Sequence, residues 1–130
     1  MSGNDRDGIS RPAGGSGPGA TFENKAALVF GSGLNIGRAV AREFAGREAR
    51  VAVADIDVAG ANETVRLIKE SGGEAVALSC DVTNLDSVRA AVSDAEARLG
   101  DLDIVMNNVG VLHSGYPEDI PLAEWERSRL

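Results

Sequence analysis

The chain has 130 residues with 20 acidic and 13 Lys or Arg side chains, and its formal net charge of −7 argues against nucleic-acid binding, which needs clustered basic residues. One cysteine, Cys80, and one histidine, His113, exclude an intramolecular disulfide and a four-ligand Cys/His zinc site, and we expect no metal. No apolar stretch approaches the roughly 20 residues that cross a bilayer and the N-terminus lacks the apolar core of a signal peptide, so we expect one cytoplasmic domain without a membrane partner.

Residues 1–21 are expected to form a flexible N-terminal tail. This segment contains six glycines, two prolines and only four scattered apolar residues, too few to offset the entropy of ordering it. The folded domain is therefore expected over residues 22–130.

Four short apolar runs are typical of parallel strands that are covered on both faces. They lie at residues 26–30, 51–54, 75–78 and 102–106. Each intervening segment has apolar residues at helical spacing. This alternation predicts an α/β fold, namely a Rossmann-type doubly wound parallel sheet with strand order 3-2-1-4 and a ligand crevice at the carboxyl ends of its strands.

The three connecting helices are expected to bury one apolar stripe each. The stripes are Ile36, Val40 and Phe44; Val58, Ala61, Val65 and Ile68; and Leu85, Val88, Val92, Ala95 and Leu99. Asp57 and Thr83 are predicted N-caps, and Gly46, Gly72 and Gly100 are predicted to end the helices. After a predicted loop at 107–121, a fourth helix begins near Leu122 and no fifth strand follows, so we expect the sheet to be truncated before strand five.

A glycine-rich turn joins the first strand to the first helix. It reads Gly31-Ser32-Gly33-Leu34-Asn35-Ile36-Gly37. Backbone N–H groups in such a turn, together with the positive N-terminus of the helix, can approach a pyrophosphate that a Cβ would keep away. The structural alternative is a close contact between helix and strand. Because no Lys-Ser/Thr pair follows the glycines, a Walker-type nucleotide site is excluded.

Asp55 ends the second strand 18 residues after Gly37, close to the spacing of about 20 at which dinucleotide-binding folds place an acid on the adenosine ribose. A carboxylate there accepts hydrogen bonds from two hydroxyls and repels a 2′-phosphate. Neither Leu34 nor Ile56 supplies a cation for such a phosphate. We therefore predict NAD in preference to NADP. The alternative role of an acid here, capping the next helix, suits Asp57 better.

Two further motifs complete a pattern that resembles the short-chain dehydrogenases/reductases. Cys80-Asp81-Val82 follows the third strand and Asn107-Asn108-Val109-Gly110 follows the fourth. The resemblance covers residues 24–130 and depends on the combination, because methyltransferases share the turn and the acid but neither later motif. It implies an NAD-dependent oxidoreductase that moves a hydride between NAD(H) and an alcohol or carbonyl compound.

The family's residue roles transfer to matching positions of this chain. Gly31 and Gly37 match the outer glycines of the pyrophosphate turn, whereas Phe30 replaces its Thr and Asn35 its middle Gly. Asn tolerates a positive φ, so Asn35 can keep the shape of the turn. The resemblance implies that Asp81 and Val82 meet the adenine, that Asn108 supports the sheet and contacts a ribose, and that Gly110 lets the chain pass close to the cofactor. The predicted cofactor-binding residues are Gly31, Leu34, Asn35, Ile36, Gly37, Asp55, Ile56, Asp81, Val82, Asn108 and Gly110.

The family's catalytic Tyr-x-x-x-Lys pair has no match in these 130 residues. In the family the Lys lowers the pKa of the Tyr, which then exchanges a proton with the substrate oxygen, aided by a Ser and a helix Asn. The only tyrosine, Tyr116, has Ile120 four residues later, and the only lysines, Lys25 and Lys69, precede it. We therefore predict no catalytic residue and expect the chain to lack the catalytic half. A non-catalytic dinucleotide-binding module and an inactive truncated fragment are the alternatives.

Three other residues have simpler interpretations than catalysis. His113 is interpreted as a solvated loop residue, Cys80 as a small buried packing residue, and Trp125 as a core or subunit contact. A small-molecule substrate is expected, its identity is not encoded here, and a homo-oligomer stays open.

Overall fold

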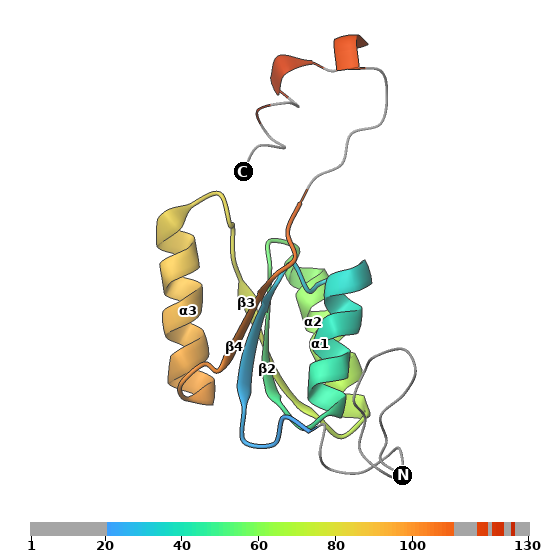
Figure 1. Ribbon diagram of the computed structural model, residues 1–130, viewed down its shortest axis with the longest axis vertical. Helices are drawn as coiled ribbons and strands as arrows, with labels where there is room; N and C mark the ends of the chain where they lie inside the picture. Colours follow the sequence, from blue (N-terminus) through green and yellow to red (C-terminus); the bar gives the residue numbers. More distant parts are fainter. Residues whose placement is uncertain (1–20, 111–116, 120, 124–125, 127–130) are drawn as a thin grey trace, which may run out of the picture.

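The computed structural model describes residues 21–110, 117–119, 121–123 and 126. In chain order its elements are β1 (Ala26–Phe30), α1 (Asn35–Gly46), β2 (Arg50–Asp55), α2 (Val58–Glu70), β3 (Glu74–Ser79), α3 (Leu85–Leu99), β4 (Ile104–Asn107) and the 3-10 helix η2 (Pro117–Asp119) (Figure 1). The predicted alternation of strands and helices is thus confirmed, and η2 lies inside the segment predicted as a loop.

The four strands form one parallel sheet with the order β3-β2-β1-β4, as predicted. At the carboxyl end of β1, Phe30 pairs with Ala54 of β2 on one side and with Asn107 of β4 on the other. Helices α1 and α2 cover one face of the sheet and α3 covers the other (Figure 1). The strand order therefore reverses between β1 and β4, which is where doubly wound sheets bind their ligands.

The core has two parts, one on each face of the sheet. Because side chains alternate along a strand, Leu28 and Phe30 of β1 pack with α3, whereas Val29 packs with α1 and α2. Phe30, which stands where the family has Thr, is 7% exposed and belongs to the α3 side. The departure at this position is therefore accommodated as a core residue.

The predicted helical stripes are wrong at their first residues. Ile36, Val58 and Leu85 are 68%, 48% and 62% exposed. Each lies in the first turn of its helix, at the carboxyl edge of the sheet, and the described residues leave its side chain largely uncovered. The rest of the α1 stripe is confirmed, because Val40 and Phe44 pack against the core. The buried residues of α1 are Gly37, Ala41 and Ala45, whose small size brings the helix close to the sheet.

The predicted helix ends are only partly correct. The Asp57 side chain accepts a hydrogen bond from the Gly60 N–H and caps α2, as predicted. The α3 cap is Asn84 rather than Thr83, because the Thr83 hydroxyl donates to the Asp81 carboxylate instead. Gly72 and Gly100 follow their helices with φ of +91° and +85°. Gly46 is still helical, and the left-handed residue that follows α1 is Glu48, with a φ of +76°.

The expectation that all four strands are covered on both faces is wrong for β4. Val105, on the α3 side of the sheet, is 58% exposed, and Ile104 and Met106 are half-buried. Within the described residues, none of the helices combines the length and the apolar composition that a bilayer crossing requires. Predictions for residues 1–20, for most of the fourth helix, and for His113, Tyr116 and Trp125 fall outside the described residues.

Candidate functional site

The glycine-rich turn is packed so tightly that its outer glycines admit no side chain. Gly31 has a φ of +74°, and a Cβ built there would meet the carbonyl group of Asn108. A Cβ on Gly37 would meet the Gly31 carbonyl and would lie 2.9 Å from the Ser32 Cα. The structural alternative named above, a close contact between helix and strand, is therefore present. This contact also keeps side chains away from the backbone at the two outer glycines of the turn.

Asn35 preserves the shape of the turn, as predicted. Its φ of +53° lies in the left-handed region, which Asn tolerates better than most residues that carry a Cβ. Leu34, Asn35 and Ile36 are all exposed, whereas Ser32 and Gly33 before them are buried. The turn thus runs from the interior to the surface, where residues 34–36 form an exposed crest at the start of α1.

The N-terminus of α1 is open to an anion. Its first-turn amides have no partner within the helix, because a helix leaves its first N–H groups unpaired and partly positive. Among the described residues, the N-cap Leu34 makes no side-chain cap hydrogen bond and the first turn contains no acid. By contrast, α2 and α3 are capped by the side chains of Asp57 and Asn84. The turn residues thus meet the requirements of a phosphate cradle.

Asp55 is the last residue of β2 and is half-buried beside this turn. One of its carboxylate oxygens accepts a hydrogen bond from the Gly33 N–H at 2.8 Å, and the other accepts one from the Asp57 N–H at 2.9 Å. These two bonds fix the orientation of the carboxylate. A carboxylate offers about four acceptor positions, so two remain for hydroxyl groups of a ligand.

Asp81 follows β3 and is held in a short turn. Its Oδ1 accepts hydrogen bonds from the Thr83 hydroxyl at 2.7 Å and from the Thr83 N–H at 3.0 Å. The hydroxyl bond, with help from the N–H, lowers the pKa of Asp81 below its ordinary value. Asp81 is therefore an ionised acceptor at neutral pH. The side chain of Val82 packs against the α3 side of the core, leaving its backbone at the carboxyl edge.

Asn108 joins the end of β4 to the glycine-rich turn. Its N–H donates to the Phe30 carbonyl at 3.1 Å, a backbone bond that continues the pairing of β4 with β1. A Cβ on Gly110 would meet nothing within 4 Å among the described residues. The contacts expected of Asn108 with a ribose and of Gly110 with a cofactor stay predictions.

Exposed apolar side chains surround this polar centre. Besides Leu34 and Ile36, they include Ile56, Val58 and Val109, which are between 43% and 68% exposed. All of them follow a strand or begin a helix, so the topology brings them to the carboxyl edge of the sheet. An apolar rim around a few oriented polar groups is typical of small-molecule sites. A cavity of about 420 Å³ lies elsewhere, between α1 and α2 near Gly46 and Ser71.

Sequence reasoning missed four residues that shape the turn, namely Gly33, Arg38, Gly60 and Thr64. A Cβ on Gly33 would lie 2.8 Å from Oδ2 of Asp55, and one on Gly60 would lie 2.9 Å from the Gly33 carbonyl oxygen. Gly33 could have been found as the inner glycine of the turn. Thr64 could have been found as a hydroxyl residue that lies beside the apolar stripe of α2.

The chain is similar in sequence to a known protein family. A family model described as short chain dehydrogenase matches residues 25–129. A probable tetrahydroxynaphthalene reductase of Zymoseptoria tritici is 42% identical over 107 residues, which are 82% of this chain and 40% of the relative. A 7α-hydroxysteroid dehydrogenase of Escherichia coli is 37% identical over 109 residues, covering 82% of this chain and 42% of the relative.

The chain is also similar in structure to solved proteins of the same kind. A short-chain type dehydrogenase/reductase from Mycobacterium marinum has a TM-score of 0.79 at 33% identity, covering 83% of this chain and 44% of that one. A 7α-hydroxysteroid dehydrogenase complexed with NADH and 7-oxo glycochenodeoxycholic acid has a TM-score of 0.77 at 36% identity, covering 83% of this chain and 42% of that one. The chain thus spans less than half the length of these relatives. By the matched model, the sequence and the strand order, it belongs to the short-chain dehydrogenase family of oxidoreductases.

Proposed function

We propose that this chain is the NAD(H)-binding part of an oxidoreductase that interconverts a small alcohol and its carbonyl compound in the cytoplasm. The observation that carries the proposal is the Asp55 carboxylate. It stands at the end of β2, held by the amides of Gly33 and Asp57, beside the uncapped start of α1. A dinucleotide needs an anion site for its pyrophosphate and a hydroxyl acceptor for its ribose. Dinucleotide-binding folds place the first at the turn after β1 and the second at the end of β2.

The residues present suit the parts of the dinucleotide. The backbone of the turn from Gly31 to Gly37 and the first amides of α1 would hold the pyrophosphate. Asp55 would accept from the adenosine ribose, and Asp81, ionised at neutral pH, would accept from the adenine amine. Bound there, NAD(H) would supply the acceptor or donor of the hydride that is exchanged with the substrate carbon.

The proposed preference for NAD over NADP rests on the charges near the adenosine ribose. A 2′-phosphate would lie against the Asp55 carboxylate, and the exposed neighbours Leu34 and Ile56 carry no positive charge. The 7α-hydroxysteroid dehydrogenase complexed with NADH supports this assignment by analogy.

Calorimetric titration of the 130-residue chain with NADH and NADPH tests the proposal. We expect NADH to bind more tightly than NADPH. Asp55→Ala should bring the two dissociation constants closer together, because it removes the acceptor for the ribose hydroxyls and also the repulsion of the 2′-phosphate. Asp94→Ala, which removes an exposed acid from α3, is the matched control and should leave the ratio unchanged. Equal or tighter binding of NADPH by the unmodified chain would contradict the proposal.

A non-catalytic dinucleotide-binding module is the second candidate. It is favoured by one observation, namely that these 130 residues contain no Tyr-x-x-x-Lys pair. On either view the 130 residues by themselves should bind NADH without oxidising or reducing an alcohol or ketone panel. Steady turnover that Tyr116→Phe or His113→Ala abolishes would overturn this expectation.

A further inference from the structure

We infer that Arg38 and Thr64 are positioning residues that fix the orientation of the peptide Gly33–Leu34, whose N–H group they turn toward the pyrophosphate. The inference rests on the proposed function, because it concerns how the same turn is held. Neither residue contacts the ligand in this account. Both act through backbone carbonyl groups of the turn.

Thr64 connects α2 to the turn through one hydroxyl group. Its side chain is fully buried, and its Oγ1 donates to the Ser32 carbonyl at 2.8 Å. The same oxygen accepts a hydrogen bond from Nε of Arg38 at 2.9 Å. A hydroxyl group has one proton to donate, and the carbonyl oxygens of Gly60 and Gly33 are also in reach, at 3.1 and 3.3 Å. The Ser32 carbonyl is the nearest acceptor, so the hydroxyl links Arg38 to the turn.

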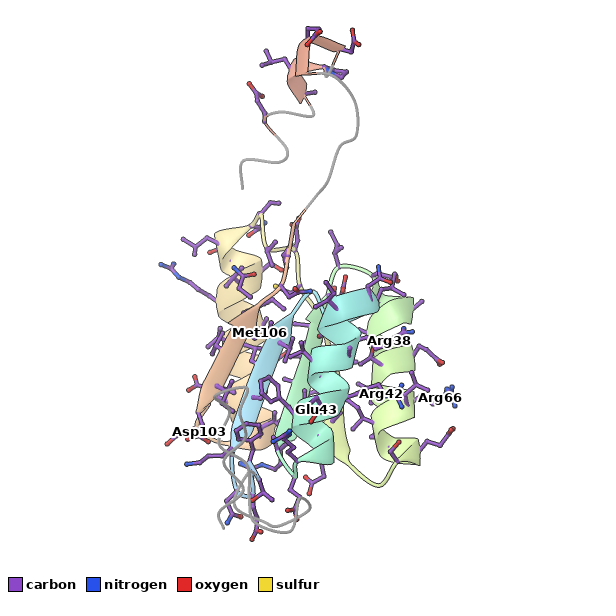
Figure 2. The ribbon with its side chains drawn as sticks, turned by 45° about the vertical axis from the view of Figure 1, so that its right-hand side comes forward. Arg38, Arg42, Glu43, Arg66, Asp103 and Met106 are labelled. Atoms are coloured by element: carbon purple, nitrogen blue, oxygen red, sulfur yellow. The ribbon has the colours of Figure 1, made fainter. Side chains whose placement is uncertain are left out.

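Arg38 supplies the second connection. Its Nη2 donates to the Gly33 carbonyl at 2.6 Å, and Figure 2 shows the side chain reaching from α1 toward α2. A cation so near the positive end of a helix is unfavourable unless another group compensates for it. Here the carbonyl oxygens of Gly33 and Gly60 accept hydrogen bonds from the guanidinium and so compensate for its charge.

These bonds determine which way the turn's amides point. In a trans peptide the C=O and N–H groups point in opposite directions. The Ser32 carbonyl is bound to Thr64 while the Gly33 N–H is bound to Asp55, so the first peptide is fixed at both ends. The Gly33 carbonyl is bound to Arg38, so the N–H of the same peptide points away from α2, toward the exposed crest.

The test compares ligands with and without a pyrophosphate. We expect Thr64→Val and Arg38→Met each to weaken ADP binding to the 130-residue chain by about tenfold, the scale of one lost hydrogen bond in a held network. Binding of adenosine, measured by NMR titration, should change less than twofold. Thr64→Ser keeps the hydroxyl and should restore ADP binding. Arg42→Met removes an exposed arginine one turn further along α1 and is the matched control.

The outcomes separate this inference from the proposed function. If the unmodified chain binds neither NADH nor ADP, the proposed function fails. If it binds both and each variant binds ADP as well as the unmodified chain does, the positioning roles are wrong. Equal losses for ADP and adenosine in both variants would show a general structural role and would also overturn the inference. Circular dichroism identifies a variant that does not fold, and the other variant then carries the test.

Discussion

Asn35 occupies a backbone conformation that most side chains avoid. At a φ of +53°, the Cβ of an ordinary residue crowds the following carbonyl oxygen, at a cost of roughly 1–2 kcal/mol. Glycine does not have this cost, and Asn reduces it through local hydrogen bonds of its amide. The turn therefore keeps its shape with Asn where the family has glycine.

Substitutions at Asn35 should separate these effects. We expect Asn35→Ala to lower the free energy of unfolding by about 1 kcal/mol, because it keeps the Cβ and loses the amide. Asn35→Gly should leave that free energy unchanged or raise it. Urea unfolding followed by far-UV circular dichroism measures both. A larger loss for Asn35→Gly than for Asn35→Ala would show that the side chain, and not the backbone angle, matters here.

The residues of the site were predictable where local chemistry decides. Asp55 and Asp57 could be told apart because one ends a strand and the other precedes a helix, and both positions are observed. The bonds of Arg38 and Thr64 could not be predicted, although Thr64 is recognisable as a hydroxyl residue beside the apolar stripe of α2. Their partners lie on the turn and on α2, and only the packing of α1 against α2 brings them together.

At the scale of elements, the helix starts also could not be predicted in full from the sequence. Periodicity predicts which face of a helix is apolar, but not whether the first turn of that face is covered, and Ile36, Val58 and Leu85 are exposed. The α3 cap was predicted one residue early. Thr83 and Asn84 are both good N-cap types, and the competing bond from Thr83 to Asp81 leaves Asn84 as the cap.

Removal of the α3 cap should therefore weaken the fold. Asn84→Ala leaves the Ser87 N–H without its acceptor and should lower the free energy of unfolding by about 1 kcal/mol. Asn84→Asp keeps an acceptor at the same position and is the matched control, with little expected change. Thermal unfolding compares the two variants. Equal stability of Asn84→Ala and the unmodified chain would contradict the assigned cap.

At the scale of the whole molecule, β4 is the least protected strand. In the part of the chain that the structure describes it pairs with β1 alone, and its Val105 side chain is 58% exposed. An edge strand with free backbone groups and an apolar side chain is a template for pairing with another chain. The edge position was expected from the absence of a fifth strand in the sequence, whereas the exposure of Val105 in particular was not predicted.

The 130-residue chain is accordingly expected to self-associate or to be loosely packed. Light scattering should give a mass above that of the monomer, and near-UV circular dichroism should show a weak signal from Trp125. Val105→Lys places a charge on the edge and should reduce association. A monodisperse monomer with a cooperative thermal transition and a fixed Trp signal would contradict this expectation.

The central claim, that the glycine-rich turn and Asp55 form the dinucleotide site, is tested most directly by amide NMR of the 130-residue chain during titration with NADH. The account predicts the largest shift changes at the amides of Leu34, Gly37 and Asp55. The amides of Ser71 and Gly73, which line the cavity between α1 and α2, should stay unchanged. Changes centred on Ser71 and Gly73, or no change at the turn, would contradict the account.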